Sequence, residues 1–260
     1  MRKIVFLILI NFLLMLKASA QSMNLEFQKD FLLEAEKFFG VDDFAAIYFS
    51  ADRVFYKQSK QKQLSFQDFQ LGEITHVDLL NPLRISLFYK NANTVVILDN
   101  HLNEITRLDF SSLENPISAE FASLSRKNQL WVVDALSGNL LNIDINSLKV
   151  ISESLPLETP YQSFASDYNN FVYTGSKQLY IYSTYATFVK SINVKPVVKM
   201  KLNQGQLLYK TNEDLILLHL KTEDEKKLKL PDILIQDFHL NGENLYLYDG
   251  KKVYFFKITV

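Results

Sequence analysis

Pairs of short apolar segments separated by a tight polar turn recur along the chain. In the clearest copy, Arg84 to Asp99, the segments RISLFYK and VVILD flank the turn NANT. Alternation or a short apolar run with polar residues at both ends is typical of β-strands. Each pair therefore predicts a β-hairpin, and similar pairs are AAIYFS-ADRVFYK, NQLWVVDALSGNLLNID, NNFVYTGSKQLYIYS, GQLLYKTNEDLILLHL and ENLYLYDGKKVYFFKI.

The hairpins repeat at a nearly constant interval. The central apolar residues of the second strands lie 36 to 43 residues apart, at Ile47, Leu87, Leu130, Phe171, Leu207 and Leu245. A period near 40 residues with about four strands in each repeat is typical of the blades of a β-propeller. The pattern predicts an all-β, six-bladed β-propeller.

The two ends of the chain predict how this ring closes. The last blade contains strands at 234–240, 244–249 and 252–259 and lacks a fourth strand, whereas the apolar segment Leu25–Leu32 precedes the first blade without a place in it. We expect this segment to be the outer strand of the last blade, because that pairing removes two exposed sheet edges. The alternative is a helix, since Phe27, Phe31, Ala35 and Phe38 follow helical spacing.

The first 20 residues have the pattern of a cleaved secretory signal peptide. Arg2 and Lys3 precede the apolar run Ile4–Leu16, and Ala18 and Ala20 supply the small residues of a cleavage site. The alternative, a membrane anchor, would need roughly 20 apolar residues. We therefore expect a signal peptide at 1–20, one propeller domain at 21–260, and no transmembrane segment after cleavage.

The composition limits which partners and which cellular location can be expected. The net charge of -1 predicts no general attraction to nucleic acid or anionic lipid. The chain has no Cys, which excludes disulfides, thiolate metal sites and a lipid-modified cysteine. An exported protein of this kind is expected to be periplasmic or associated with the outer membrane.

Candidate chemistry is sparse. No HExxH, GxSxG, GxGxxG or P-loop motif is present. His76 and His239 fall on predicted first strands and could face a central channel, although an ordinary histidine is the simpler interpretation. The carboxylates of Asp42-Asp43 could take part in acid–base catalysis or bind calcium. A role in a local turn is favoured, because Asp side chains in turns bond their own backbone.

The single tryptophan and the short loops also give no indication of a catalytic site. Trp131, the only tryptophan, lies mid-strand and is expected in the core and not in a ligand platform. Nearly every connection has about 2 to 6 residues, so no long insertion covers a catalytic pocket. We assign no catalytic, cofactor-binding or metal-binding residue, expect no cofactor, and do not expect an enzyme.

Three stretches resemble a known family. They are NPLRISLFYKNANTVVILDNHLNEITRLDF, NQLWVVDALSGNLLNID and YATFVKSINV, and they are similar to exported propeller-like proteins of Bacteroidota-type bacteria. The resemblance implies a non-enzymatic periplasmic or outer-membrane-associated part. It carries no activity that can be transferred to particular residues, and the WD and YWTD patterns of better-known propellers are missing.

The function expected from the sequence is protein binding. An export signal, short loops and the lack of a catalytic motif favour a scaffold or accessory component of an outer-membrane assembly or secretion complex. One alternative is a propeller enzyme or carbohydrate-binding module that uses one face of the disc, since His76 and His239 could point inward. Another is a surface structural protein without a discrete ligand.

Overall fold

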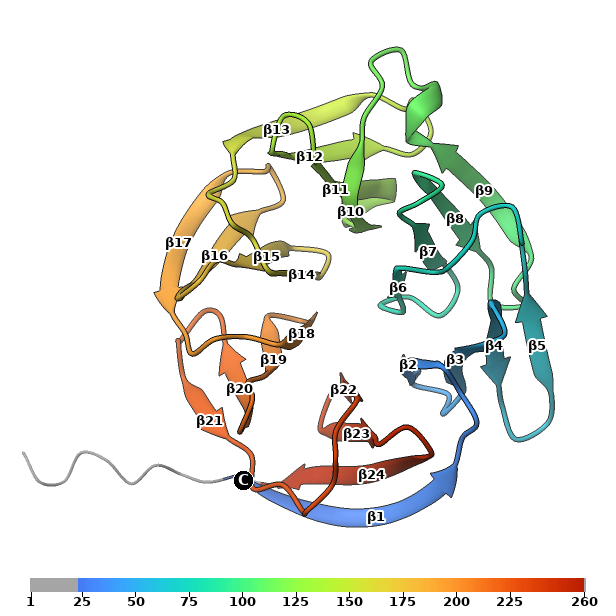
Figure 1. Cartoon of the computed structure of the whole chain (residues 1–260), viewed down its shortest axis with the longest axis vertical. Helices are drawn as coiled ribbons and strands as arrows, with labels where there is room; N and C mark the ends of the chain where they lie inside the picture. The colour runs from blue at the N-terminus through green and yellow to red at the C-terminus, as the bar shows by residue number, and fades with distance from the viewer. Residues whose placement is uncertain (1–22, 260) are drawn as a thin grey trace, which may run out of the picture.

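Six four-stranded antiparallel sheets surround a central axis (Figure 1). The computed structural model describes residues 23–259. The predicted signal peptide at 1–20 and its cleavage site lie outside these residues. The all-β, six-bladed propeller predicted from the repeat is confirmed, with each sheet forming one blade.

The strands follow the predicted hairpins closely. Blades one to three contain β2 (Lys37–Val41), β3 (Ile47–Ala51), β4 (Val54–Gln58), β5 (Gln63–Phe66); β6 (His76–Asp78), β7 (Ile85–Tyr89), β8 (Thr94–Leu98), β9 (Glu104–Asp109); and β10 (Ala119–Leu124), β11 (Gln129–Asp134), β12 (Asn139–Asp144), β13 (Val150–Pro156). Blades four to six contain β14 (Ser163–Ser166), β15 (Asn170–Thr174), β16 (Gln178–Ser183), β17 (Phe188–Asn193); β18 (Lys199–Asn203), β19 (Gln206–Lys210), β20 (Leu215–His219), β21 (Glu225–Lys227); and β22 (Asp237–Asn241), β23 (Asn244–Tyr248), β24 (Lys252–Thr259), β1 (Asn24–Leu32). Two short 3-10 turns, η1 (Phe110–Ser112) and η2 (Arg126–Asn128), precede and follow β10.

The segment at the start of the described chain is a strand. β1 pairs antiparallel with β24 from Asn24 opposite Thr259 to Leu32 opposite Lys252, and the two strands lie side by side at the rim (Figure 1). Lys252 Nζ also forms an ion pair with Asp30 at 2.7 Å. The helical alternative for this segment is not formed, because pairing satisfies the backbone of an otherwise open sheet edge.

One predicted strand ends earlier than expected. The sequence pattern predicts the outer strand of blade five at 226–230, whereas β21 ends at Lys227. The Leu228 amide still donates a hydrogen bond to the Leu215 carbonyl of β20 at 3.0 Å, and the Leu228 side chain is 1% exposed and packs between blades five and six. The pairing stops beyond this bond, before Lys229 and Leu230, an end that a run of alternating residues does not reveal.

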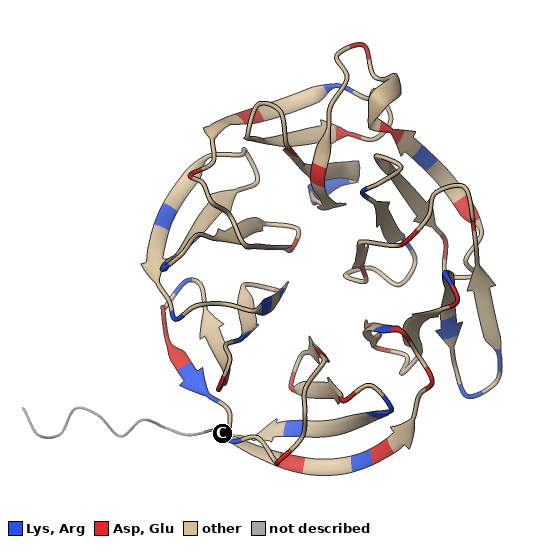
Figure 2. Cartoon of the chain, in the orientation of Figure 1, with Lys and Arg blue, Asp and Glu red and all other residues tan. Residues whose placement is uncertain are grey.

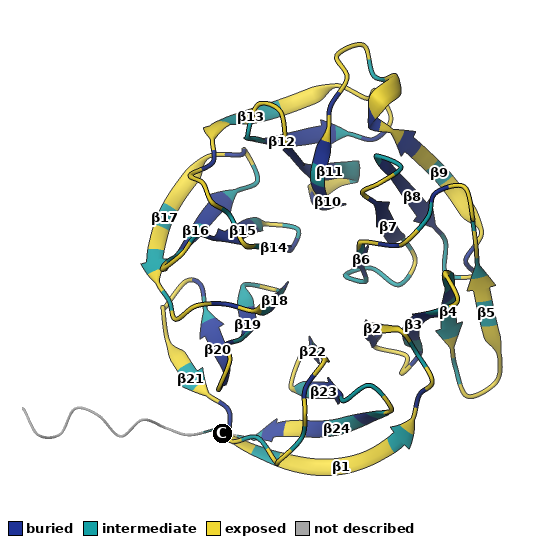
Figure 3. Cartoon of the chain, viewed as in Figure 1, coloured by how far each residue is buried: buried dark blue, intermediate teal, exposed yellow. Residues whose placement is uncertain are grey.

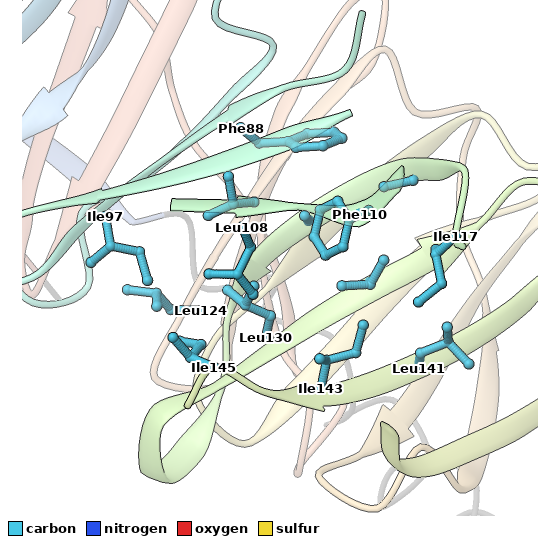
Figure 4. Close-up of a cluster of buried hydrophobic side chains, with 14 residues drawn as sticks. Phe88, Ile97, Leu108, Phe110, Ile117, Leu124, Leu130, Leu141, Ile143 and Ile145 are labelled. Carbon is cyan, nitrogen blue, oxygen red and sulfur yellow. The ribbon is translucent and has the colours of Figure 1, made fainter. Parts of the chain in front are cut away.

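The core lies between the blades. Inner strands are buried and outer strands exposed (Figure 3). Apolar side chains of neighbouring blades form shared clusters, such as the one that contains Phe88 of β7 and Leu130 of β11 (Figure 4). Trp131 is fully buried, and its Nε1 donates a hydrogen bond to the Asp167 carbonyl of the next blade at 2.9 Å. The predicted core role of Trp131 is confirmed.

Candidate binding site in the central channel

The innermost strands of all six blades line a cavity on the axis. We call the disc face on which these strands end the exit face and the opposite one the entry face. The cavity has a volume of about 120 Å³ and opens at the exit face. Its lining includes polar and charged side chains from every blade: Asp42, Asp43, His76, Asp78, Ser123, Ser166, Lys201, Asn203, Gln206, His239 and Asn241.

Two of the four histidines, His76 and His239, line this cavity, so the channel-facing position that the sequence left open holds, and the simpler interpretation of ordinary histidines does not describe where they lie. The His76 ring on β6 packs against Phe121, with 4.7 Å between the ring centroids. The His239 ring on β22 lies directly against Gly40, where an added Cβ would be 2.6 Å from Nδ1. The other two lie elsewhere: His101 is exposed in the turn after β8, and His219 ends β20 with Nδ1 accepting a hydrogen bond from the Thr222 amide.

Electrostatics keep both channel imidazoles neutral. Each contacts the cavity on one side but is otherwise enclosed by protein, and this burial, together with the nearby charge of Lys201, lowers the pKa of His76 to about 3 and that of His239 to about 3. Burial also lowers the pKa of Lys201, which the Asp237 carboxylate partly offsets. Lys201 is the only Lys or Arg among the residues that line the cavity.

The carboxylates of the lining are already occupied by hydrogen bonds. Asp78 accepts from the Ser123 hydroxyl at 2.7 Å and from the Leu124 amide at 3.1 Å, both in the next blade. Asp42 accepts from two amides of its own turn and from Tyr48 Oη at 2.8 Å. The turn role predicted for the Asp42-Asp43 pair is confirmed for Asp42, whereas the Asp43 side chain bonds to another blade.

Asp43 and Asp78 also line the cavity, and each has a hydrogen-bond partner in a neighbouring blade. Asp43 accepts a hydrogen bond from Asn241 Nδ2 at 2.8 Å, which ties blade six to blade one. Burial raises the pKa of Asp78, although its hydrogen bonds oppose this. The acidic groups therefore hold the blades together and offer few free acceptors to a ligand.

Two hydrogen-bond donors of the lining, by contrast, lack a partner in residues 23–259. The Ser166 side chain on β14 is 8% exposed, and its hydroxyl has no hydrogen-bond partner within residues 23–259. Lys201 Nζ forms no ion pair within 4.0 Å in that same range. A site with free donors suits a ligand that supplies acceptor atoms.

Lys201 is the charged residue of the cavity lining that the sequence pattern does not point to. It lies between Met200 and Leu202 on β18, and all three residues line the cavity. The sequence gives little signal for it, because Lys201 continues the polar–apolar alternation of an ordinary half-exposed strand.

Two classes of site are not found. Residues 23–259 contain no group of three or more His, Asp or Glu side chains arranged to hold a metal ion. No helix in that range has the length and apolar character to cross a bilayer.

The neutral histidines predict a specific pH dependence of stability. Between pH 7.5 and 5.0, each of His76 and His239 is expected to reduce the free energy of unfolding by about 1–2 kcal/mol. The unfolded imidazoles, with an ordinary pKa near 6.5, take up protons in this range, whereas the folded ones, with pKa values of about 3, do not. The unfolded state thus binds more protons and gains stability as the pH falls.

Urea unfolding at both pH values measures this effect. His76→Gln and His239→Gln should each lose less stability on acidification than the parent protein. The raised pKa of Asp78 acts in the opposite direction, but Asp78 is present in all three proteins and so largely cancels. Equal losses for the parent and both variants would contradict the assignment.

Comparison with known proteins identifies the fold. No protein-family model and no curated protein sequence matches the chain. Solved propellers do match: the WD40 domain of Neurospora crassa Pan2 (11% identity, 86% of this chain and 74% of that chain, TM-score 0.55) and BamB from Moraxella catarrhalis (11%, 90% and 99%, 0.53). Virginiamycin B lyase from Staphylococcus aureus is similar as well (10%, 84% and 79%, 0.57). The likeness is one of fold.

Proposed function

We propose that this chain is a non-catalytic, protein-binding propeller that acts as an accessory or scaffold component of an outer-membrane assembly or secretion complex. The observation that carries the proposal is a set of exposed apolar side chains on the entry face. The predicted signal peptide supports the periplasmic side of the outer membrane as its location, and the short loops support binding over catalysis.

The apolar side chains occur where one blade connects to the next. Five of the six connections, or the strand ends beside them, carry an apolar side chain that is 55% to 84% exposed. We call these residues the entry-face set: Leu32, Phe69, Leu155, Val198 and Leu234. A rigid disc that presents apolar side chains around one face is suited to bury them against another protein.

Charge supports a protein partner over a nucleic acid. Basic and acidic residues are both spread around the ring (Figure 2). Surface ion pairs such as Lys90–Glu120 and Lys190–Glu223 neutralise several of the basic groups. A nucleic-acid site would require a concentrated basic surface.

Affinity capture with matched variants tests the proposal. The tagged full chain, cross-linked in its own cells and recovered from membrane extracts, should enrich outer-membrane proteins. The double variant Leu155→Asp/Leu234→Asp should reduce their recovery at least tenfold, because a charge in a buried interface is strongly unfavourable. The control Phe44→Asp/Tyr185→Asp alters two equally exposed side chains, 78% and 75%, on the exit face and should retain them.

Two outcomes would contradict the proposal. Either no protein is enriched above an untagged strain, or the exit-face control loses the partner as completely as the entry-face variant. Release of the protein by osmotic shock, measured in the same cells, checks its export; retention with cytoplasmic markers would remove the periplasmic part of the proposal.

A further inference from the structure

We propose that the cavity at the exit end of the channel binds a small organic acid, whose carboxylate group is held by Lys201 and Ser166. This site is separate from the entry-face set, because it opens at the opposite face of the disc. The proposal concerns a ligand, and it stands whether or not the entry face binds a protein.

In the cavity lining, the carboxylate acceptors are bonded within the protein, whereas two of the hydrogen-bond donors are not. The carboxylates of Asp42, Asp43 and Asp78 accept hydrogen bonds from groups of the ring itself. The ammonium group of Lys201 and the hydroxyl of Ser166 are unpaired within residues 23–259. A buried polar group without a partner costs about 1–3 kcal/mol, so a ligand that accepts from the Ser166 hydroxyl would relieve a cost that the fold now carries, and its charge would pair with Lys201.

Charge selects a monoanion. Lys201 supplies one positive charge, and the two histidines are neutral at pH 7, since burial and Lys201 hold each pKa at about 3. The same wall contains acidic side chains, which would repel a dianion such as phosphate more strongly than a monocarboxylate. A single carboxylate matches the single free cation, and the low local dielectric strengthens the pair.

Size and shape limit the rest of the ligand. One water molecule needs on the order of 10–15 Å³ of such a cavity, so the volume of about 120 Å³ holds several waters or one small acid. Met200 and Leu202 offer apolar contacts beside Lys201, while Gln206 and Asn241 also line the cavity and can bond a hydroxyl group. Short acids such as acetate, propanoate and lactate therefore fit.

The test uses these three acids as probes with the purified chain. Each sodium salt, compared with sodium chloride at equal ionic strength, should raise the unfolding temperature and give a saturable calorimetric binding curve. Acetamide, which has nearly the shape of acetate without its charge, should do neither. Lys201→Met should weaken binding about tenfold or more, because a charge-assisted hydrogen bond is lost, and Ser166→Ala should weaken it less.

The matched control is Lys199→Met. Lys199 lies on the same strand, two residues away, but forms an ion pair with Asp237 at 2.6 Å and does not line the cavity. This variant should bind the acids with unchanged affinity. The inference is overturned if no acid binds, if acetamide is as effective, or if Lys199→Met loses as much affinity as Lys201→Met.

Discussion

Replacement of Phe171 with alanine is expected to lower the free energy of unfolding by about 3–5 kcal/mol. Phe171 is fully buried on β15. Its ring centroid lies 6.0 Å from that of Trp131, 5.9 Å from that of Phe121 and 6.0 Å from that of Phe164. The substitution therefore removes a large side chain from the junction of blades three and four, and it also ends several aromatic contacts worth about 0.5–1.5 kcal/mol each.

Guanidinium unfolding of the two proteins measures the loss. Phe188→Ala is the matched control, because Phe188 is in the same blade on the outer strand β17 and is 51% exposed. It should change stability by less than about 1 kcal/mol. Similar losses for the two variants would mean that the junction between these blades does not depend on close packing around Phe171.

The architecture could be predicted because the hairpin pattern and the 36-to-43-residue repeat both indicate the same six blades. Each second strand, such as Ile85–Tyr89 or Gln129–Asp134, is buried along nearly its whole length, as expected for a sheet covered on both faces by neighbouring blades. The spacing of these strands then fixed the number of blades. The end of β21 could not be predicted, since the Leu228 side chain next to it packs in a cluster formed by two blades that meet only in the folded ring.

The candidate site was predictable in part. His76 and His239 were placed on first strands by the repeat, and the structure brings both to the axis. The sequence does not identify Lys201 as a cavity residue. Alternation along a strand distinguishes a buried face from an exposed one, but it does not show that the exposed face of a first strand borders a cavity at the centre of a ring. The shortage of free acceptors at the site depends on hydrogen bonds between blades, such as that from Ser123 to Asp78, whose partners are distant in sequence.

The same bonds link the site to the stability of the ring. Asp78 ties blade two to blade three, and Asp167 accepts a hydrogen bond from the Gly205 amide of blade five at 2.7 Å. Asn241 closes the circle by donating to Asp43 in blade one. Polar residues at the ends of the innermost strands thus bond neighbouring blades to one another around the cavity.

Removal of β1 is expected to cost about 4 kcal/mol or more. Eight residues of β1 have partners on β24, and each backbone hydrogen bond contributes about 0.5–1.5 kcal/mol net. The strand also places Phe27 against Phe256, with 5.6 Å between the ring centroids, and packs Phe31 on the cluster between blades six and one. A chain that starts at Leu33 should therefore unfold at lower denaturant than one that starts at Met23, and the bare edge of β24 should promote self-association.

A peptide added in trans separates loss of the strand from general damage. A synthetic peptide of residues 23–32 should bind the shortened chain and restore its unfolding midpoint and its monomeric state, because an extended peptide can add to an open sheet edge. A peptide of the same composition in scrambled order is the control and should restore neither. If the shortened chain matched the longer one in stability and remained monomeric, the ring would be closed by the contacts between blades one and six alone, such as Tyr248 Oη donating to the Ala35 carbonyl at 2.7 Å.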